Sequence, residues 1–365
     1  MTTRPRFIVI ASNLDAGGGV QVASSLIDEL GIMFSAGDRS VDIDFVVSSA
    51  VHGNLGSKMQ ERVHLDDHGP AVRPRRIRPT AGHYDVAFVV FGPLYHRISA
   101  HRLLLGYADV TSLYPDFNQP GIRGRVRRTI SLHQARNADR LVVETGAIKD
   151  AVVARTGRDR DTIDVVANAV NGQVLERSAA LSPLLPTALS TVIRLGYPAR
   201  NYPHKNVDFL GALGEELTIL GVPVEFVLTM RPLEWTNLSD RTRAHSINVG
   251  ELGVSRVGDL IRECDGVIFP SLLEAASATP LEALALGSPL FASDRDFVRS
   301  VAHGAATYFD PLDACSAARS IRDALANPAL ARLKSELGHQ VTQDLPTARD
   351  RADRILAIMT LMLER

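Results

Sequence analysis

The sequence GVIFPSLLEAASATPLEALALGSPLFA, residues 266–292, holds two short apolar runs separated by a polar loop and a helical pattern. The runs at 266–269 and 289–292 are typical of buried strands, and the apolar spacing at 280–286 predicts a helix. A strand, a crossover helix and a second strand form the βαβ unit of a parallel sheet that helices cover on both faces. This stretch therefore predicts an α/β fold.

The same alternation of short apolar runs and amphipathic stretches continues outward in both directions. The predicted strands of the first half are 7–11, 43–47, 86–91, 140–143 and 162–166, with a helix at 20–30. In the second half we predict further strands at 192–195 and 224–228, and helices at 206–220, 257–262 and 349–365. Two doubly wound, Rossmann-like domains are the simplest architecture, and such sheets bind ligands at the carboxyl ends of their strands.

The length of the chain agrees with two domains, because 365 residues exceed the usual size of one. A Ser/Ala/Pro-rich, uncharged stretch at 178–190 indicates a loose region near the boundary. We predict an N-terminal domain at 1–172 and a C-terminal domain at 173–345. The last helix, within 346–365, is expected to pack back on the N-terminal domain.

Composition excludes several classes of protein. With 40 basic and 41 acidic residues the chain has no field that would favour nucleic acid as a partner. Two cysteines cannot build a disulfide framework or a four-ligand zinc site, and no apolar run approaches the ~20 residues of a membrane span. The first apolar run is typical of a buried strand rather than a signal peptide. We therefore expect a cytoplasmic protein.

A glycine-rich turn follows the first predicted strand and opens a helix, in the sequence Asp15-Ala-Gly-Gly-Gly19-Val. Glycines allow backbone N–H groups to approach an anion, and a helix N-terminus favours negative charge. The pattern is not G-x-G-x-x-G, which weakens a dinucleotide interpretation. A phosphate-binding turn and a simple tight turn both remain open.

A second post-strand loop, Arg200-Asn-Tyr-Pro-His-Lys205, carries two cations five residues apart. Such a pair can hold a diphosphate from two sides. The alternative is a solvated loop, although a cation near a helix start opposes the helix dipole.

Two carboxylates lie in the quoted stretch. Thr279, Pro280 and Glu282 fit the N-cap, N1 and N3 positions of a capping box, which would explain Glu282 without a ligand. Glu274 has no such structural role, since it lies in the loop after a buried strand. A pair of carboxylates also fits acid/base hydrolysis, and their spacing in the sequence does not exclude it.

Three D-x-D triplets, at 42–44, 159–161 and 294–296, could suggest a metal-dependent transferase. We interpret all three as surface positions. No H-E-x-x-H or G-x-S-x-G pattern occurs, and neither cysteine lies in a nucleophile setting. We expect no metal site and no bound cofactor.

The E-x7-E pattern of Glu274 and Glu282, with PSLLE before the loop and EALALGSPLFASD after it, resembles the retaining glycosyltransferases of family 4. Arg200 and Lys205 match the R-x4-K pair of that family. Further matches in family order are the glycine-rich turn, the NAVN sequence at 168–171 and AATYFDP at 305–311. The resemblance implies the GT-B fold, in which two Rossmann-like domains enclose an interdomain cleft.

The resemblance also implies roles for these residues. Arg200 and Lys205 would hold the diphosphate of a nucleotide-sugar donor and stabilise the leaving group. Glu274 would face the transferred sugar, and Glu282 would bind the ribose hydroxyls. Further donor contacts would come from the residues Gly18, Gly19, Gly250, Ala276, Ser277 and Ala278. Such enzymes need no metal, because the two cations do the electrostatic work.

One departure from the family pattern concerns the donor sugar. The family has Gly-Phe-Gly after the first glutamate, where this chain has Ala275-Ala276-Ser277. Side-chain volume near the sugar is therefore different, and the identity of the sugar, like that of the base, is not fixed by the sequence.

The resemblance places the acceptor on the N-terminal domain. His96 and His101, in the stretch that follows the predicted strand at 86–91, are candidate sugar contacts, although such histidines are often solvated. Two basic stretches, from Arg73 to Arg78 and from Arg123 to Arg128, can dock on an anionic membrane or can be solvated surface. Either stretch would bring the protein to the inner membrane face.

The resemblance thus implies a metal-independent hexosyltransferase, EC 2.4, with retention of configuration. The acceptor would be a glycan or a lipid-linked hydroxyl compound. Sequences at 92–95 and 106–108 resemble enzymes of bacterial surface polysaccharides, which suggests polysaccharide or glycolipid synthesis. The alternatives are a non-catalytic GT-B scaffold or glycan-binding protein and a GT-B nucleotide-sugar epimerase.

Overall fold

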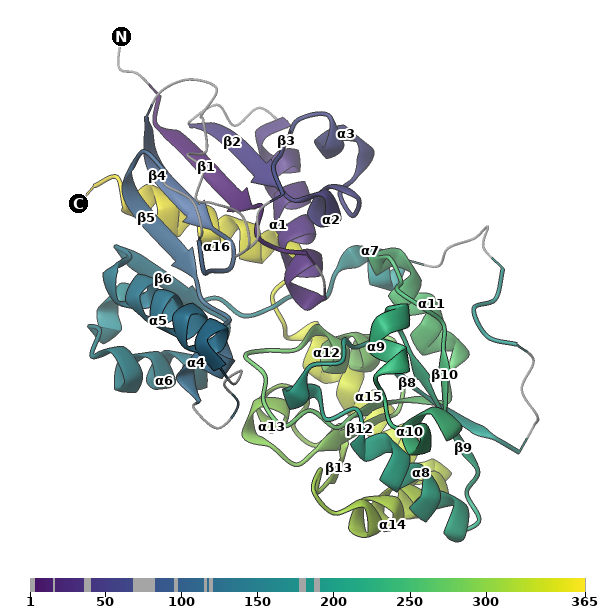
Figure 1. Ribbon diagram of the computed structural model, residues 1–365. Coiled ribbons are helices and arrows are strands. Elements are labelled where there is room, and N and C mark those ends of the chain that lie inside the picture. The colour runs from purple at the N-terminus through teal and green to yellow at the C-terminus, as the bar shows by residue number, and fades with distance from the viewer. Residues whose placement is uncertain are drawn as a thin grey trace. The chain divides into compact units, whose positions relative to one another are not determined.

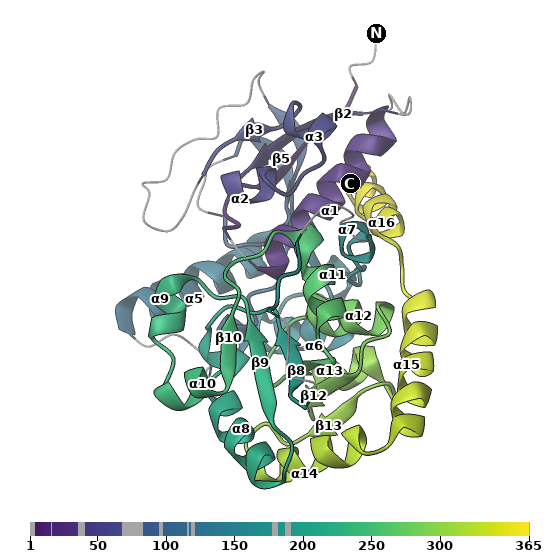
Figure 2. The same ribbon diagram turned by 90° about the vertical axis from the view of Figure 1, so that its right-hand side faces the viewer.

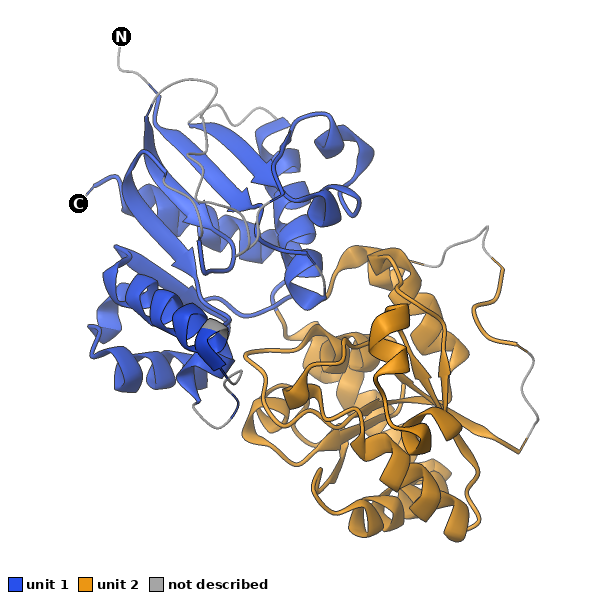
Figure 3. Cartoon of the chain, in the orientation of Figure 1, with its two compact units in different colours: residues 1–169, 346–365 blue, residues 170–345 orange. Residues whose placement is uncertain are grey.

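The chain forms two compact units, each built on one parallel sheet (Figures 1, 2 and 3). The structure is a computed structural model that describes residues 4–15, 17–35, 41–67, 83–94, 98–114, 117, 121–176, 182–186 and 191–364. Unit 1 comprises residues 1–169 and 346–365, and unit 2 comprises residues 170–345. The prediction of two doubly wound α/β domains is confirmed.

Unit 1 has a parallel sheet of strand order β3-β2-β1-β4-β5-β6-β7. The strands are β1 (Arg6–Ala11), β2 (Asp42–Val47), β3 (His64–Leu65), β4 (Tyr84–Val89), β5 (Ala100–Gly106), β6 (Arg140–Val143) and β7 (Ile163–Val165). Its helices are α1 (Gly18–Ser35), α2 (Ser49–His52), α3 (Ser57–Gln60), α4 (Val110–Leu113), α5 (Gly121–Asn137), α6 (Gly146–Thr156) and α16 (Ala348–Leu361), with a 3-10 turn at Arg160–Thr162.

The centre of this sheet explains its apolar sequence. β1 pairs with β2 on one side and β4 on the other, so that Phe7 lies opposite both Ile43 and Val86. Residues 7–11 are all buried, because helices cover both faces of a central parallel strand.

Helix α16 belongs to the core of unit 1, although it ends the chain. It begins with a capping box, in which Thr347 and Asp350 bond to each other's backbone N–H groups. The helix lies beside α1 (Figure 1). Its buried face consists of Ala352, Ile355, Ile358, Met359 and Met362, all in the apolar cluster around β1.

Unit 2 has a parallel sheet of strand order β10-β9-β8-β11-β12-β13. The strands are β8 (Ile193–Tyr197), β9 (Val224–Leu228), β10 (Ser246–Asn248), β11 (Gly266–Phe269), β12 (Leu290–Ser293) and β13 (Thr307–Phe309). The helices are α7 (Gly172–Leu175), α8 (Phe209–Ile219), α9 (Pro232–Thr236), α10 (Asp240–Ala244), α11 (Val254–Glu263), α12 (Ala278–Ala285), α13 (Asp296–Ala302), α14 (Ala314–Leu325) and α15 (Pro328–Gln343), with a 3-10 turn at Pro203–Lys205.

Several predicted boundaries are wrong. No strand was predicted between 86–91 and 140–143, where the structure has β5. The helix expected at 206–220 begins three residues later, at Phe209, because Asn206 adopts a left-handed conformation with φ 55° after the 3-10 turn. Asn tolerates this conformation better than most residues. The predicted helix at 280–286 begins two residues earlier, at Ala278.

Among the described residues, no helix combines the length and the apolar character needed to cross a membrane.

The buried face of α16 generates a test of the fold of unit 1. Ile355→Ala removes a fully buried side chain and should destabilise unit 1 by about 2–5 kcal/mol. Hydrogen exchange of the β1 amides measures the change. Leu361→Ala, on the exposed side of the same helix, is the matched control and should cost under about 1 kcal/mol. Equal protection of β1 in both variants would contradict a core role for α16.

Candidate functional site

The candidate site of unit 2 lies where the chain leaves the carboxyl ends of β8 and β11. These neighbouring strands are the switch point of the sheet, since β9 and β10 continue on one side and β12 and β13 on the other. The loops after both strands are joined directly. Leu272 N donates to the His204 carbonyl at 2.7 Å, and Asn206 Nδ2 donates to the carbonyls of Pro270 and Pro311 at 3.3 and 2.9 Å.

Hydrogen bonds between buried hydroxyl groups and the backbone hold the two loops in place. Tyr197, the last residue of β8, donates its hydroxyl proton to the Lys205 carbonyl at 3.0 Å. Its oxygen lies 2.8 Å from Ser271 Oγ, so the serine is the donor in that contact. Ser293 Oγ donates to the Ser271 carbonyl at 2.7 Å. Burial raises the pKa of Tyr197 well above its usual value, which keeps this donor protonated.

Lys205 and Glu274 are brought together by these loops. Lys205 Nζ lies 2.5 Å from Glu274 Oε1, and both side chains are largely buried. The contact is a charge pair rather than a well-aligned hydrogen bond. Nζ also lies 5.8 Å from the centroid of the Phe269 ring. Two residues that the sequence places 69 positions apart therefore form one unit at the end of β11.

Arg200 is also paired with carboxylates. Its Nε lies 2.9 and 2.8 Å from the two carboxylate oxygens of Glu234, and its Nη1 lies 3.3 Å from Glu251 Oε1. Arg231 Nε donates to the same Glu251 oxygen at 2.7 Å. Sequence reasoning missed Glu234 and Arg231, because they belong to no motif and lie more than 30 residues from Arg200.

Glu282 is the most deeply buried carboxylate of the site. The capping box predicted for it is absent, because α12 begins at Ala278 and its N-cap residue, Ser277, makes no side-chain cap bond. Within the described part of the chain, Glu282 Oε1 has no hydrogen-bond partner. Burial raises its pKa to about 7. A buried oxygen without a partner is rare in native proteins, which makes Glu282 a candidate for contact with a ligand donor.

The other predicted donor contacts of unit 2 lie on the same edge. Ala276, Ser277 and Ala278 lead from β11 into the first turn of α12, where backbone N–H groups lack helical partners. Gly250 follows β10 and has a φ of +79°, which favours glycine. Asn248 holds that loop, accepting from the N–H groups of Met230 and Gly250 at 2.8 and 3.2 Å.

In unit 1, Gly18 and Gly19 begin α1 after the carboxyl end of β1. A Cβ on Gly18 would meet no atom within 4 Å, so the backbone there is open to close approach. Gly17, rather than Gly18 or Gly19, adopts a backbone conformation that favours glycine, with a φ of +71°.

The two predicted histidine contacts have different outcomes. His96 lies outside the described residues. His101 is exposed in the second position of β5, where its ring contacts that of His83 at a centroid distance of 3.9 Å. This is the amino end of a parallel strand, opposite the edge at which such sheets bind ligands, and the sugar contact of His101 stays a prediction.

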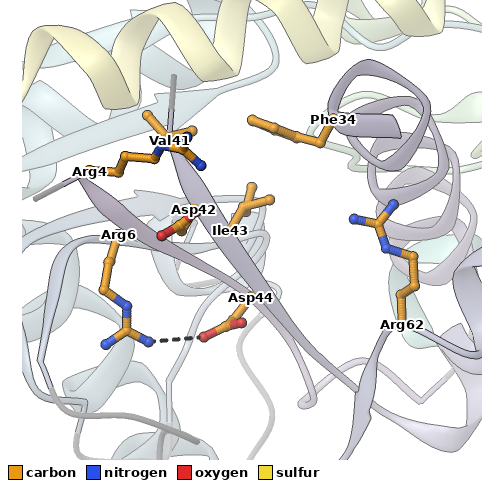
Figure 4. A pocket seen from close by; sticks show the side chains of 8 residues that line it. All are labelled: Arg4, Arg6, Phe34, Val41, Asp42, Ile43, Asp44 and Arg62. Carbon is orange, nitrogen blue, oxygen red and sulfur yellow. Dashed lines mark hydrogen bonds and ion pairs between the residues drawn. The ribbon is translucent and has the colours of Figure 1, made fainter. Parts of the chain in front are cut away.

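Figure 4 shows a cavity at the amino edge of the same sheet, lined by residues of β1, β2 and α1 and by Arg4 and Arg62. It includes the first D-x-D triplet. Asp42 is exposed, whereas Asp44 pairs with Arg6 at 3.4 Å and accepts from the Tyr84 hydroxyl at 2.7 Å. Among the described residues, no cluster of three or more His, Cys, Asp or Glu side chains could hold a metal ion.

Part of the sequence and the whole fold are similar to known proteins. Residues 238–341 match the family described as glycosyl transferases group 1. No curated protein matches the sequence. The chain is similar in structure to sucrose-phosphate synthase from Thermosynechococcus elongatus, with 16% identity over 99% of this chain and 100% of that one and a TM-score of 0.70.

Two other solved structures are also similar to this chain. One is HepE from Anabaena in complex with UDP and glucose, with 12% identity over 98% of this chain and 100% of that one and a TM-score of 0.69. The other is WaaG, a glycosyltransferase involved in lipopolysaccharide biosynthesis, with 12% identity over 97% and 99% and a TM-score of 0.67. The fold is therefore that of GT-B glycosyltransferases, and the segment matched by the family contains β11 and α12.

The raised pKa of Glu282 generates a prediction about stability. The folded state holds its proton more tightly than the unfolded state, whose pKa is about 4.5. The contribution of this carboxyl group to the free energy of unfolding is therefore fully present below about pH 4.5, and about 3 kcal/mol of it is lost as the pH rises through about 7. Glu282→Gln should remove this fall, because its amide does not titrate.

The measurement is denaturant unfolding followed through Trp235, the single tryptophan, which lies in unit 2. The difference in unfolding free energy between Glu282→Gln and wild type should grow between pH 5 and pH 8. Glu336→Gln, at an exposed position of α15, is the control. Parallel pH profiles for wild type and Glu282→Gln would show that the buried carboxyl titrates normally.

Proposed function

We propose that the protein is a retaining glycosyltransferase that moves a hexose-type sugar from a nucleoside-diphosphate-sugar to a hydroxyl acceptor. The observation that carries the proposal is the loop junction of unit 2. There, Lys205, Arg200 and Glu274 lie at the switch point of the sheet. Helix α12, which follows the loop of Glu274, carries Glu282, whose Oε1 has no partner among the described residues. The match of residues 238–341 to the glycosyl transferases group 1 family supports it.

In this reaction the cations stabilise the departing diphosphate. The bond between the anomeric carbon and the β-phosphate oxygen breaks, and its electron pair leaves on that oxygen. Arg200 and Lys205 offset the charge that develops there. The acceptor oxygen bonds to the anomeric carbon on the face from which the diphosphate leaves, and the acceptor proton passes to the leaving oxygen. No covalent enzyme intermediate is required.

The carboxylates bind rather than react. Glu282 accepts hydrogen bonds from the ribose hydroxyls, which would satisfy its partnerless oxygen. Glu274 faces the sugar, as do the backbone groups of Ala276, Ser277 and Ala278. The similar HepE structure is a complex with UDP and glucose, so uridine diphosphate is the first donor nucleotide to test.

The acceptor is proposed to be a glycan or a lipid-linked compound at the membrane surface. Helix α5 exposes Ile122 and Val126 beside Arg125 and Arg127. Exposed apolar and basic side chains on one helix favour contact with anionic lipid. The stretch from Arg73 to Arg78 lies outside the described residues. The role of WaaG in lipopolysaccharide biosynthesis supports the same class of pathway.

A non-catalytic GT-B protein is the second candidate. Ala275-Ala276-Ser277, which replaces the glycine-containing pattern next to the sugar, favours it. Nucleotide binding without turnover of any donor would establish that alternative.

The first experiment is a thermal melt with UDP, GDP, ADP and dTDP, each with and without EDTA. A ligand at 100 times its dissociation constant stabilises by about 2.7 kcal/mol, which a melt detects. We expect one diphosphate to stabilise the protein equally in both conditions. If none of the four nucleotides raised the melting temperature, the proposed donor site would be overturned. If EDTA abolished the rise, binding would depend on a metal ion, contrary to the proposal.

Lys205→Ala tests the chemistry itself. Loss of this cation should lower kcat at saturating donor by about 10²–10³-fold, because the leaving-group charge is no longer stabilised. Lys334→Ala is the control, since that side chain is also part-buried in unit 2 but donates to the Ala306 carbonyl. Full turnover by Lys205→Ala would exclude the proposed role.

A further inference from the structure

The charged cluster around Arg200 divides into two unequal carboxylate contacts. Glu234 is mostly buried and places both oxygens within 2.9 Å of Arg200 Nε. Glu251 is half-exposed and reaches Nη1 at 3.3 Å. Within the described residues, Nη2 of Arg200 has no partner. The guanidinium is therefore fixed at its Nε edge, with its outer nitrogens held loosely or not at all.

Glu234 is itself fixed by the backbone. It lies in the short helix α9, and its Oε2 accepts from the Arg231 backbone N–H at 3.1 Å. The carboxylate that holds Arg200 is thereby tied to the chain that leaves β9. Among the described residues, Glu251 has no such backbone contact. Arg200 and Arg231 share its Oε1, and Arg231 Nε lies closer, at 2.7 Å against 3.3 Å.

We infer that Glu234 is the positioning residue of Arg200, and that Glu251 occupies a guanidinium position that an anionic ligand takes over. This inference rests on the proposed function. A guanidinium presents its donors in a rigid fork, so anchoring Nε orients the outer nitrogens toward one place. Glu251 can be displaced at little cost, since it is half-exposed and keeps Arg231 as a partner.

The two carboxylates therefore have opposite expected effects. Glu234→Gln loses the charged anchor, and the misplaced Arg200 should lower kcat by roughly 10–100-fold. Glu234→Asp keeps the negative charge on a shorter side chain. Its kcat should lie between the values of Glu234→Gln and the wild type. Glu251→Gln removes a competitor for the guanidinium, so the affinity for the nucleoside diphosphate should stay equal or rise.

The matched control is Glu225→Gln. Glu225 Oε2 accepts from Arg194 Nε at 2.9 Å in the same unit, on strands β9 and β8, so this variant loses an equivalent ion pair. Its melting temperature should change about as much as that of Glu234→Gln, and its kcat should not change. A general loss of stability would affect both variants alike.

The decisive measurement uses the Arg200→Ala background. If Glu234 acts through Arg200, adding Glu234→Gln to Arg200→Ala should cause no further loss of kcat. A further 10-fold loss, or wild-type kcat in Glu234→Gln alone, would overturn the inference while the proposed function stands. Absence of nucleotide binding and turnover in the wild-type protein would overturn both.

Discussion

The parallel pairing of β8 with β11 is the constraint on which the candidate site depends. The two strands run side by side with Gly266 opposite Leu195 and Val267 opposite Gly196. A Cβ on Gly196 would lie 3.2 Å from the Cys264 sulfur, so the glycine leaves room for the side chain that precedes β11. Because parallel strands end at one edge, the pairing delivers both following loops to the same place. The 2.5 Å contact between Lys205 and Glu274 is a consequence of that register.

Charge balance gives the second constraint on this edge. Lys205, Arg200 and Arg231 are each matched by a carboxylate of unit 2. Such partly buried pairs contribute little net stability, because desolvation offsets their attraction. Apolar residues could fill the same space at similar or lower free energy. In the proposed function, a diphosphate would take the place of a carboxylate on Arg200 and Lys205.

Prediction from the sequence succeeded where the residues favour the secondary structure that their burial in the fold also requires. Residues 266–292 fold as the expected strand, loop, helix and strand, because each apolar run is both β-rich and buried. β5 was missed because its first half, Ala-His-Arg, is polar and only part-buried. The predicted capping box of Glu282 was wrong because the helix starts before Thr279. Glu234 could not be predicted, since only the pairing of β8 with β9 brings it to Arg200.

The environments of Glu274 and Glu282 differ, and the proposed sugar transfer uses that difference. Acid/base hydrolysis uses two carboxyl groups as acid and base, whereas here Glu274 forms an ion pair with Lys205. In the proposed reaction the diphosphate takes Lys205 and leaves Glu274 without its counter-charge in a largely buried position. Sugar hydroxyls are donors that can replace the ammonium. Under this proposal a nucleotide-sugar would satisfy both partners of the broken pair, whereas a nucleoside diphosphate alone would satisfy only the lysine.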